Sequence, residues 1–126
     1  MARILLVNDE PDLLELMSMA LENAGHVVES TTKGRAVIDI ARRFRPDVIG
    51  IDWVIPDMSG ADVLRELTST PDLRAIPVVV ISALERLESD AKHRGACRVL
   101  RKPFRPEQLV GAIADVLAGE PATISR

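Results

Sequence analysis

The chain has very few aromatic residues and a single cysteine. Among its 126 residues there are two phenylalanines, one tryptophan and no tyrosine. Sites that stack nucleobases or flavin rings need more aromatic surface, so such sites are largely excluded. One cysteine, Cys97, allows neither an intrachain disulfide nor a multi-cysteine zinc site. We therefore expect a protein of the cytoplasm.

The sequence also lacks a basic surplus and any long apolar run. It has 16 Lys and Arg residues against 19 Asp and Glu residues, a net charge of −3, whereas a nucleic-acid-binding domain would carry a basic stripe. Apolar runs such as 78–81 are far shorter than the roughly 18 residues that cross a membrane. Polar residues at 8–10 come too early for a signal peptide. We predict no direct nucleic-acid partner and no membrane association.

Two kinds of segment alternate along the chain. Short runs rich in β-branched apolar residues are typical of strands that are buried on both faces. Between them lie segments with apolar residues at helical spacing, bounded by proline or glycine. The predicted strands cover residues 3–7, 26–30, 47–51, 77–82 and 98–100. The predicted helices cover residues 11–24, 37–44, 63–67, 85–94 and 106–118.

This alternation predicts one α/β domain, a parallel five-stranded sheet with helices on both faces. We assign residues 1–119 to this domain and residues 120–126 to a short frayed tail. A doubly wound sheet with the flavodoxin-like order 2-1-3-4-5 would place the first and third strands side by side, and sites then form at the carboxyl ends of the strands.

Carboxylates follow two of these strands. Asp9 comes after the first and Asp52 after the third. Two neighbouring carboxylates repel unless a cation lies between them, and Mg²⁺ prefers oxygen ligands and retains waters. Asp9, Asp52 and the backbone carbonyl of Val54 would suffice as protein ligands. Either acid taken alone is more simply interpreted as the solvated end of a loop.

Two further polar side chains stand at the same edge. Ser82 ends the fourth strand and could donate a hydrogen bond to an anionic oxygen on Asp52. Lys102 follows the fifth strand and precedes Pro103, where a cis peptide bond is most easily formed. Taken alone, the serine would cap backbone groups and the lysine would lie on the surface.

These residues resemble the receiver domain of bacterial two-component response regulators, from Arg3 to about Leu117. Any one of the matching pieces is weak evidence, but all five at this spacing are specific. They are residues 4–11, the pattern Asp52-x3-Pro56-Asp57-Met58-x-Gly60, and the pieces Ser82-Ala83, Gly95-Ala96 and Lys102-Pro103-Phe104.

The resemblance implies a role for each site residue. Asp52 matches the phosphoacceptor, which takes a phosphoryl group from a sensor histidine kinase or a histidine phosphotransfer protein. Asp9 and the Val54 carbonyl match ligands of Mg²⁺ or Mn²⁺, Ser82 matches the switch hydroxyl, and Lys102 matches the lysine that pairs with the phosphoryl group. The implied function is to switch binding to a downstream protein target. We expect no enzymatic activity beyond slow self-dephosphorylation.

The chain departs from the family pattern in ways that bear on this function. Asn8 replaces a second acid, which should weaken metal binding, and it could reach the metal only through water. Val99 replaces a common aromatic switch residue. Arg101 would bias the surface toward an acidic partner, and Cys97 matches no family site.

Three other functions would also fit a parallel α/β domain with an acidic edge. A pseudo-receiver would bind partners without phosphorylation, and Asn8 and Val99 would be its signs of decay. An aspartate-based phosphatase would need an acid two residues after the nucleophile, where Val54 stands. A flavodoxin would need aromatic ring clamps and a phosphate loop after the first strand, both missing here.

Overall fold

The computed structural model describes residues 1–83, 98–119 and 124–125. The predicted strands and helices within these residues are all present, and the predicted helix over 85–94 and Cys97 lie outside them. The elements are β1 (Arg3–Val7), α1 (Pro11–Asn23), β2 (Val27–Thr31), the 3-10 turn η1 (Gly34–Ala36), α2 (Val37–Phe44), β3 (Val48–Asp52), α3 (Gly60–Ser69), β4 (Val78–Ser82), β5 (Arg98–Arg101), α5 (Pro106–Leu117) and β6 (Ile124–Ser125).

The sheet is parallel and has the strand order β2-β1-β3-β4-β5-β6. The predicted order 2-1-3-4-5 is confirmed. Beyond these five strands, two residues of the segment predicted as a tail, Ile124 and Ser125, pair with Val99 and Leu100. Without them β5 would be an edge strand in the described sheet, with unpaired backbone groups that favour the addition of a strand.

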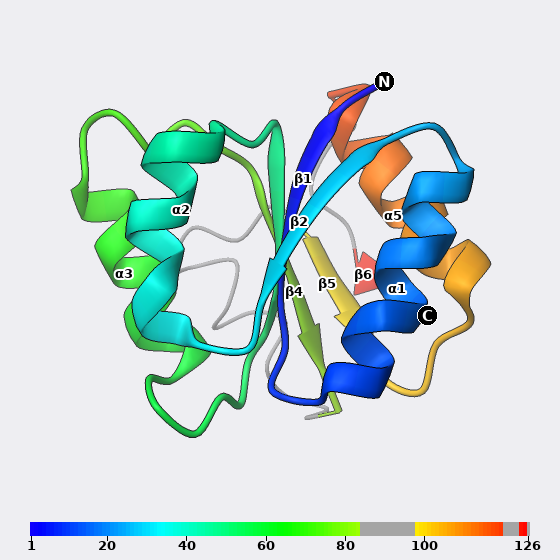
Figure 1. Ribbon diagram of the computed structural model, residues 1–126, viewed down its shortest axis with the longest axis horizontal. Helices are drawn as coiled ribbons and strands as arrows, with labels where there is room; N and C mark the ends of the chain where they lie inside the picture. Colours follow the sequence, from blue (N-terminus) through cyan, green and yellow to red (C-terminus); the bar gives the residue numbers. More distant parts are fainter. Residues whose placement is uncertain (84–97, 120–123, 126) are drawn as a thin grey trace.

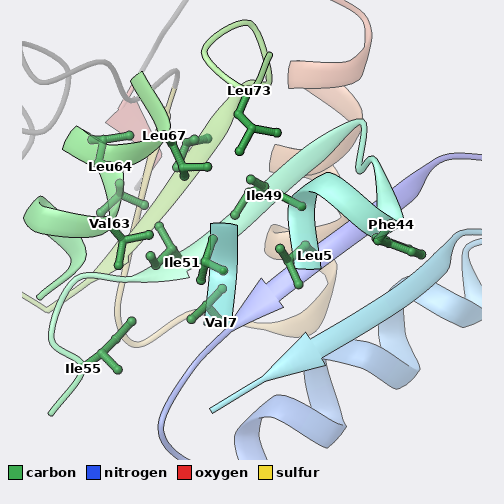
Figure 2. Close-up of a cluster of buried hydrophobic side chains, with 14 of the residues drawn as sticks. Leu5, Val7, Phe44, Ile49, Ile51, Ile55, Val63, Leu64, Leu67 and Leu73 are labelled. Atoms are coloured by element: carbon green, nitrogen blue, oxygen red, sulfur yellow. The ribbon is translucent and has the colours of Figure 1, made fainter. Parts of the chain in front are cut away.

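Helices cover both faces of the sheet (Figure 1): α1 and α5 lie on one face, α2 and α3 on the other. Side chains along a strand point alternately to the two faces, so each strand contributes to both apolar layers. In β1, Ile4 and Leu6 pack with α1 and α5, whereas Leu5 and Val7 pack on the α2–α3 side (Figure 2). This double burial explains why the strands read as continuous apolar runs.

The helix ends follow local sequence signals. Helix α2 ends at Phe44, and Arg45 adopts a left-handed φ of 53° just before Pro46. Helix α3 begins at Gly60, three residues earlier than its apolar stripe predicts, because the Ser59 side chain accepts a hydrogen bond from the Asp62 backbone N–H. This cap places the helix start directly after the loop that follows β3.

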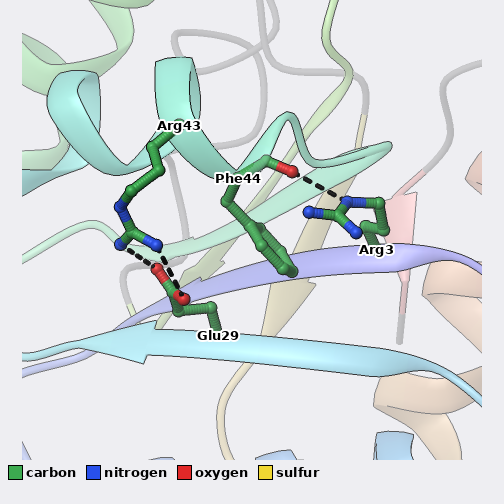
Figure 3. A network of polar contacts seen from close by, with 4 residues as sticks. All are labelled: Arg3, Glu29, Arg43 and Phe44. Atoms are coloured by element: carbon green, nitrogen blue, oxygen red, sulfur yellow. Dashed lines mark hydrogen bonds and ion pairs between the residues drawn. The ribbon is translucent and has the colours of Figure 1, made fainter.

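Polar contacts attach α2 to the first two strands (Figure 3). The Arg43 guanidinium of α2 donates hydrogen bonds to the Glu29 carboxylate of β2. The hydrogen bonding and the negative charge of Glu29 raise the pKa of Arg43. Arg3 Nε donates to the Phe44 carbonyl at 2.8 Å, and its guanidinium lies 4.3 Å from the Phe44 ring centroid. Exposed ion pairs contribute only about 0–1 kcal/mol, so the apolar layers dominate.

We expect Gly60→Ala to destabilise the fold strongly. A Cβ at residue 60 would lie 2.7 Å from Trp53 Cα and 2.8 Å from Trp53 O, and neither backbone atom can rotate away. The Gly60 N–H also donates to that carbonyl at 2.8 Å. The cost should be about 1–3 kcal/mol in urea unfolding, the usual range for overpacking.

Gly111→Ala is the matched control in α5. Its added Cβ would meet nothing within 4 Å, so the free energy of unfolding should rise by up to about 1 kcal/mol through helix propensity. Equal effects at the two glycines would show that contact with Trp53 does not constrain residue 60.

Candidate functional site

Asp52 lies at the centre of the carboxyl edge of the sheet. It is the last residue of β3 and only 4 % exposed. Its Oδ2 accepts a hydrogen bond from Lys102 Nζ at 2.8 Å, and its Oδ1 accepts one from the Val54 backbone N–H at 3.2 Å. A buried carboxylate without such partners would carry a large desolvation cost. The ammonium offsets this charge, and one oxygen still faces the loop after β3.

Lys102 is held by the end of β5. Its backbone N–H donates to the Ser82 carbonyl at 2.9 Å, which continues the pairing of β4 with β5. The Lys102–Pro103 peptide bond is cis. Ser82 ends β4 and is 2 % exposed. The lysine and serine expected from sequence thus lie side by side on adjacent strands, and the lysine contacts Asp52 directly.

Asn8 stands next to Asp52 across the sheet. Val7 pairs with Ile51, so residue 8 follows β1 at the level of Asp52. The side chain is fully buried. Its Oδ1 accepts a hydrogen bond from the Glu10 backbone N–H at 2.9 Å, whereas Nδ2 has no hydrogen-bond partner in the part of the chain that the structure describes. No pattern in the sequence predicts this orientation of the amide.

The remaining predicted metal ligands, Asp9 and Val54, are more exposed than Asp52. Asp9 is half-buried, and the Val54 side chain is 64 % exposed, which leaves this loop open to solvent. In the described residues, no three His, Cys, Asp or Glu side chains form a group that could hold a metal. Two carboxylates and one carbonyl are nonetheless a set that fits Mg²⁺, which keeps several of its waters.

Asp57 has a structural role that its sequence context does not predict. Its carboxylate accepts hydrogen bonds from the backbone N–H groups of Gly34, at 2.9 Å, and Arg35, at 3.1 Å. These bonds, that from Arg35 foremost, lower the pKa of Asp57. They tie the loop after Asp52 to the segment that begins η1. A Pro-Asp pair in a loop is the only signal in the sequence, and it does not identify the partners.

The low pKa of Asp57 predicts a pH-dependent contribution to stability. A carboxyl with a lowered pKa in the folded state stabilises fully above its unfolded pKa of about 3.9, and the effect is lost as the pH falls through the folded value. Urea unfolding should therefore show Asp57→Ala less stable than the wild type at neutral pH, with the gap narrowing below about pH 4. A constant gap would mean that the carboxylate charge is not what holds the loop.

Two departures from the expected pattern take a definite place. Val99 is fully buried in β5 and packs within the core cluster on the α2–α3 side. It therefore fills core space and offers no aromatic ring at the surface. Arg101 ends β5, partly buried, opposite Ser82.

No helix among the described residues is long and apolar enough to cross a membrane.

Comparison with known proteins points to one family. The profile of the response regulator receiver domain matches residues 4–114. Protein PilH of Pseudomonas aeruginosa is 37 % identical over 122 residues, which cover 94 % of this chain and 100 % of PilH. The probable transcriptional regulatory protein TcrX of Mycobacterium tuberculosis is 38 % identical over 109 residues. These cover 85 % of this chain but 46 % of TcrX, so the chain spans about half of that relative.

A solved structure shares the fold as well. The chemotaxis response regulator CheY4 of Vibrio cholerae superposes with a TM-score of 0.86 at 29 % identity, covering 92 % of this chain and 98 % of the CheY4 chain. Its similarity extends over nearly the whole chain, as does that of PilH.

Proposed function

This chain belongs to the response regulator receiver domain family, and we propose that Asp52 is its phosphoacceptor. Receiver domains are signalling modules of two-component systems rather than classical enzymes, and they interact with histidine kinases and downstream targets. Phosphorylation and Mg²⁺ binding at an acidic pocket are general features of the family. One observation carries the proposal: the buried Asp52 carboxylate, 2.8 Å from the Lys102 ammonium.

The proposed reaction transfers a phosphoryl group from a phosphohistidine. A carboxylate oxygen of Asp52 attacks phosphorus, and the P–O bond forms as the P–N bond breaks. The electron pair stays on the departing imidazole nitrogen, which takes up a proton. Lys102 offsets negative charge on the transferring group, and the backbone N–H of Val54 orients the attacking carboxylate through Oδ1.

A divalent cation completes this chemistry. Asp9, Asp52 and the Val54 carbonyl are the groups that would hold Mg²⁺, or Mn²⁺ in its place. When bound, the cation supplies positive charge that offsets the phosphoryl oxygens. The Asp52 carboxylate and the Lys102 ammonium, 2.8 Å apart, form the rest of the proposed site.

Switching would follow from the position of Lys102 and Ser82 on adjacent strand ends. A phosphoryl group on Asp52 gives Lys102 a new anionic partner and gives the Ser82 hydroxyl an oxygen to approach. We propose that these movements alter the face made by β5 and α5; the predicted helix over 85–94, which was expected to share this face, lies outside the described residues. Because Val99 is a core residue, the change is transmitted without an aromatic side chain at that position.

The proposed partners are a histidine kinase or phosphotransfer protein upstream and a protein target downstream, all in the cytoplasm. Relatives such as the DNA-binding response regulator MtrA are about twice as long as the matched region, so their DNA binding is not carried over. We take residues 1–119 as the receiver, residues 120–126 as its tail, and any self-dephosphorylation as slow. A pseudo-receiver is not favoured, because Asp9, Asp52, Ser82 and Lys102 are all present and the Asp52–Lys102 contact is formed.

The proposal is tested by incubating the protein with Mg²⁺ and acetyl phosphate and measuring intact mass. We expect the mass of the protein to increase by that of one phosphoryl group. Hydroxylamine should remove this group, because it cleaves acyl phosphates. A parallel sample of a phosphorylatable receiver verifies the reagent. No mass gain alongside a modified control would contradict the proposal and favour the pseudo-receiver.

A further inference from the structure

Within the residues that the structure describes, the buried Asn8 side chain has an unpaired hydrogen-bond donor, and residue 8 lies beside the proposed phosphoryl site. The side chain is fully buried, and the β1–β3 register sets residue 8 next to Asp52. Nδ2 has no hydrogen-bond partner among the described residues. A buried donor left unpaired costs about 1–3 kcal/mol. A bound ligand with an acceptor oxygen would provide the missing hydrogen-bond partner.

The orientation of this amide is fixed by its neighbour. Asn8 Oδ1 accepts the Glu10 backbone N–H at 2.9 Å. If the amide were flipped, its NH₂ group would face that N–H, and two donors would oppose each other. The oxygen therefore belongs to the turn, and Nδ2 is the atom that remains available.

A donor selects an anion rather than a hydrated cation. Water bound to Mg²⁺ turns its hydrogens outward and acts as a donor, so an NH₂ group cannot hold it. Oδ1 could accept from such a water only through its second lone pair, because the Glu10 N–H already occupies one. Nδ2 is suited to a carboxylate or phosphoryl oxygen, which differs from the water-mediated metal contact that the sequence suggested for Asn8.

The net charge of the site also favours the binding of an anion next to Asn8. With asparagine at residue 8, the charged side chains Asp9, Asp52 and Lys102 carry a net charge of −1. An aspartate at this position would make it −2 and would repel an incoming phosphoryl dianion more strongly. The neutral amide lowers this repulsion and also offers a hydrogen bond.

We propose that Asn8 Nδ2 binds an oxygen of the phosphoryl group on Asp52 and so lowers the dependence of the phosphorylated state on Mg²⁺. This inference rests on the proposed function, because it requires Asp52 to be the acceptor. Asn8 replaces part of the cation's role with a fixed donor. The cost is weaker binding of Mg²⁺ to the unphosphorylated protein.

Beryllofluoride, a phosphoryl-sized anion that attaches to carboxylates, provides the test. Its affinity is measured by calorimetry in EDTA and in saturating Mg²⁺ for the wild type, Asn8→Asp and Asn8→Ala. Asn8→Asp keeps an acceptor for the Glu10 N–H, lacks the donor and adds a negative charge. Asn8→Ala also lacks the donor but adds no charge. In EDTA we expect wild-type affinity to exceed that of each variant by about tenfold or more, the worth of a charge-assisted hydrogen bond.

The dependence on metal separates a phosphoryl-binding role from a structural one. A residue that only holds the turn would change beryllofluoride affinity equally with and without Mg²⁺. We expect Mg²⁺ to restore Asn8→Asp to wild-type affinity or better. In the absence of beryllofluoride, a Mg²⁺ titration followed by Trp53 fluorescence should show tighter binding for Asn8→Asp than for the wild type.

Two outcomes would overturn the inference, and they are distinguishable. If Asp52 is phosphorylated but Asn8→Ala matches the wild type in EDTA, Asn8 does not bind the phosphoryl group and the proposed function stands. If neither acetyl phosphate nor beryllofluoride modifies the wild type at any Mg²⁺ concentration, the proposed function fails and this inference fails with it. Thermal melts of each variant verify that it is folded.

Discussion

Asp52→Asn should abolish phosphorylation by acetyl phosphate. The amide has nearly the shape of the carboxylate, but its single oxygen can keep only one of the two hydrogen bonds from Lys102 and the Val54 N–H, which Oδ2 and Oδ1 of Asp52 accept. It lacks the anionic oxygen that attacks phosphorus. Intact mass should therefore show one added phosphoryl group for the wild type and none for the variant.

The control for this experiment is Asp57→Asn. Asp57 is five positions along the chain and its carboxylate is committed to the Gly34 and Arg35 N–H groups. This variant should still gain one phosphoryl group on Asp52. Modification that persists in Asp52→Asn, mapped to Ser82 or elsewhere, would show that the acceptor has been wrongly assigned.

The sheet and the Asp52–Lys102 contact were predictable because they depend on strand order. β4 is buried at every position, and such a run fits only a strand covered on both faces. The carboxyl ends of parallel strands meet at one edge, so residues 50 positions apart become neighbours. Strand limits were off by up to one residue, since polar residues such as Asp47 precede the paired segment.

Contacts that depend on tertiary placement were not predictable. The Ser59-Gly60 pair suggests a loop, yet Gly60 begins a helix whose backbone packs against Trp53. The bonds from Gly34 and Arg35 to Asp57 join loops 22 or 23 residues apart and follow no periodicity. The amide orientation of Asn8 depends on one backbone N–H. Local sequence patterns carry no information about such contacts.

Lys102→Ala should destabilise the unphosphorylated protein substantially. Asp52 is only 4 % exposed, and the substitution would remove the ammonium group that pairs with its carboxylate. Loss of a hydrogen bond to a charged group costs about 1.5–3 kcal/mol. Urea unfolding at neutral pH should show this loss, whereas Lys33→Ala, which removes an exposed lysine, should change stability little.

The same variant should separate phosphorylation from switching. The Asp52 nucleophile remains, so Lys102→Ala should still gain a phosphoryl group, although more slowly because charge on the transferring group is less well offset. Without the ammonium, the phosphoryl group has no cation fixed to the end of β5. Phosphorylation should then leave amide hydrogen exchange in β5 and α5 unchanged, whereas the wild type should show altered exchange there.

A double-mutant cycle identifies the physical cause of the lost stability. If Lys102→Ala is destabilising because it leaves a buried charge unpaired, adding Asp52→Asn removes that charge and should recover part of the free energy of unfolding. The two effects are then non-additive, with the double variant more stable than Lys102→Ala alone. Additive losses would mean that Lys102 acts through packing of its aliphatic stem. If phosphorylation changes amide hydrogen exchange in Lys102→Ala as much as in the wild type, another group couples Asp52 to β5.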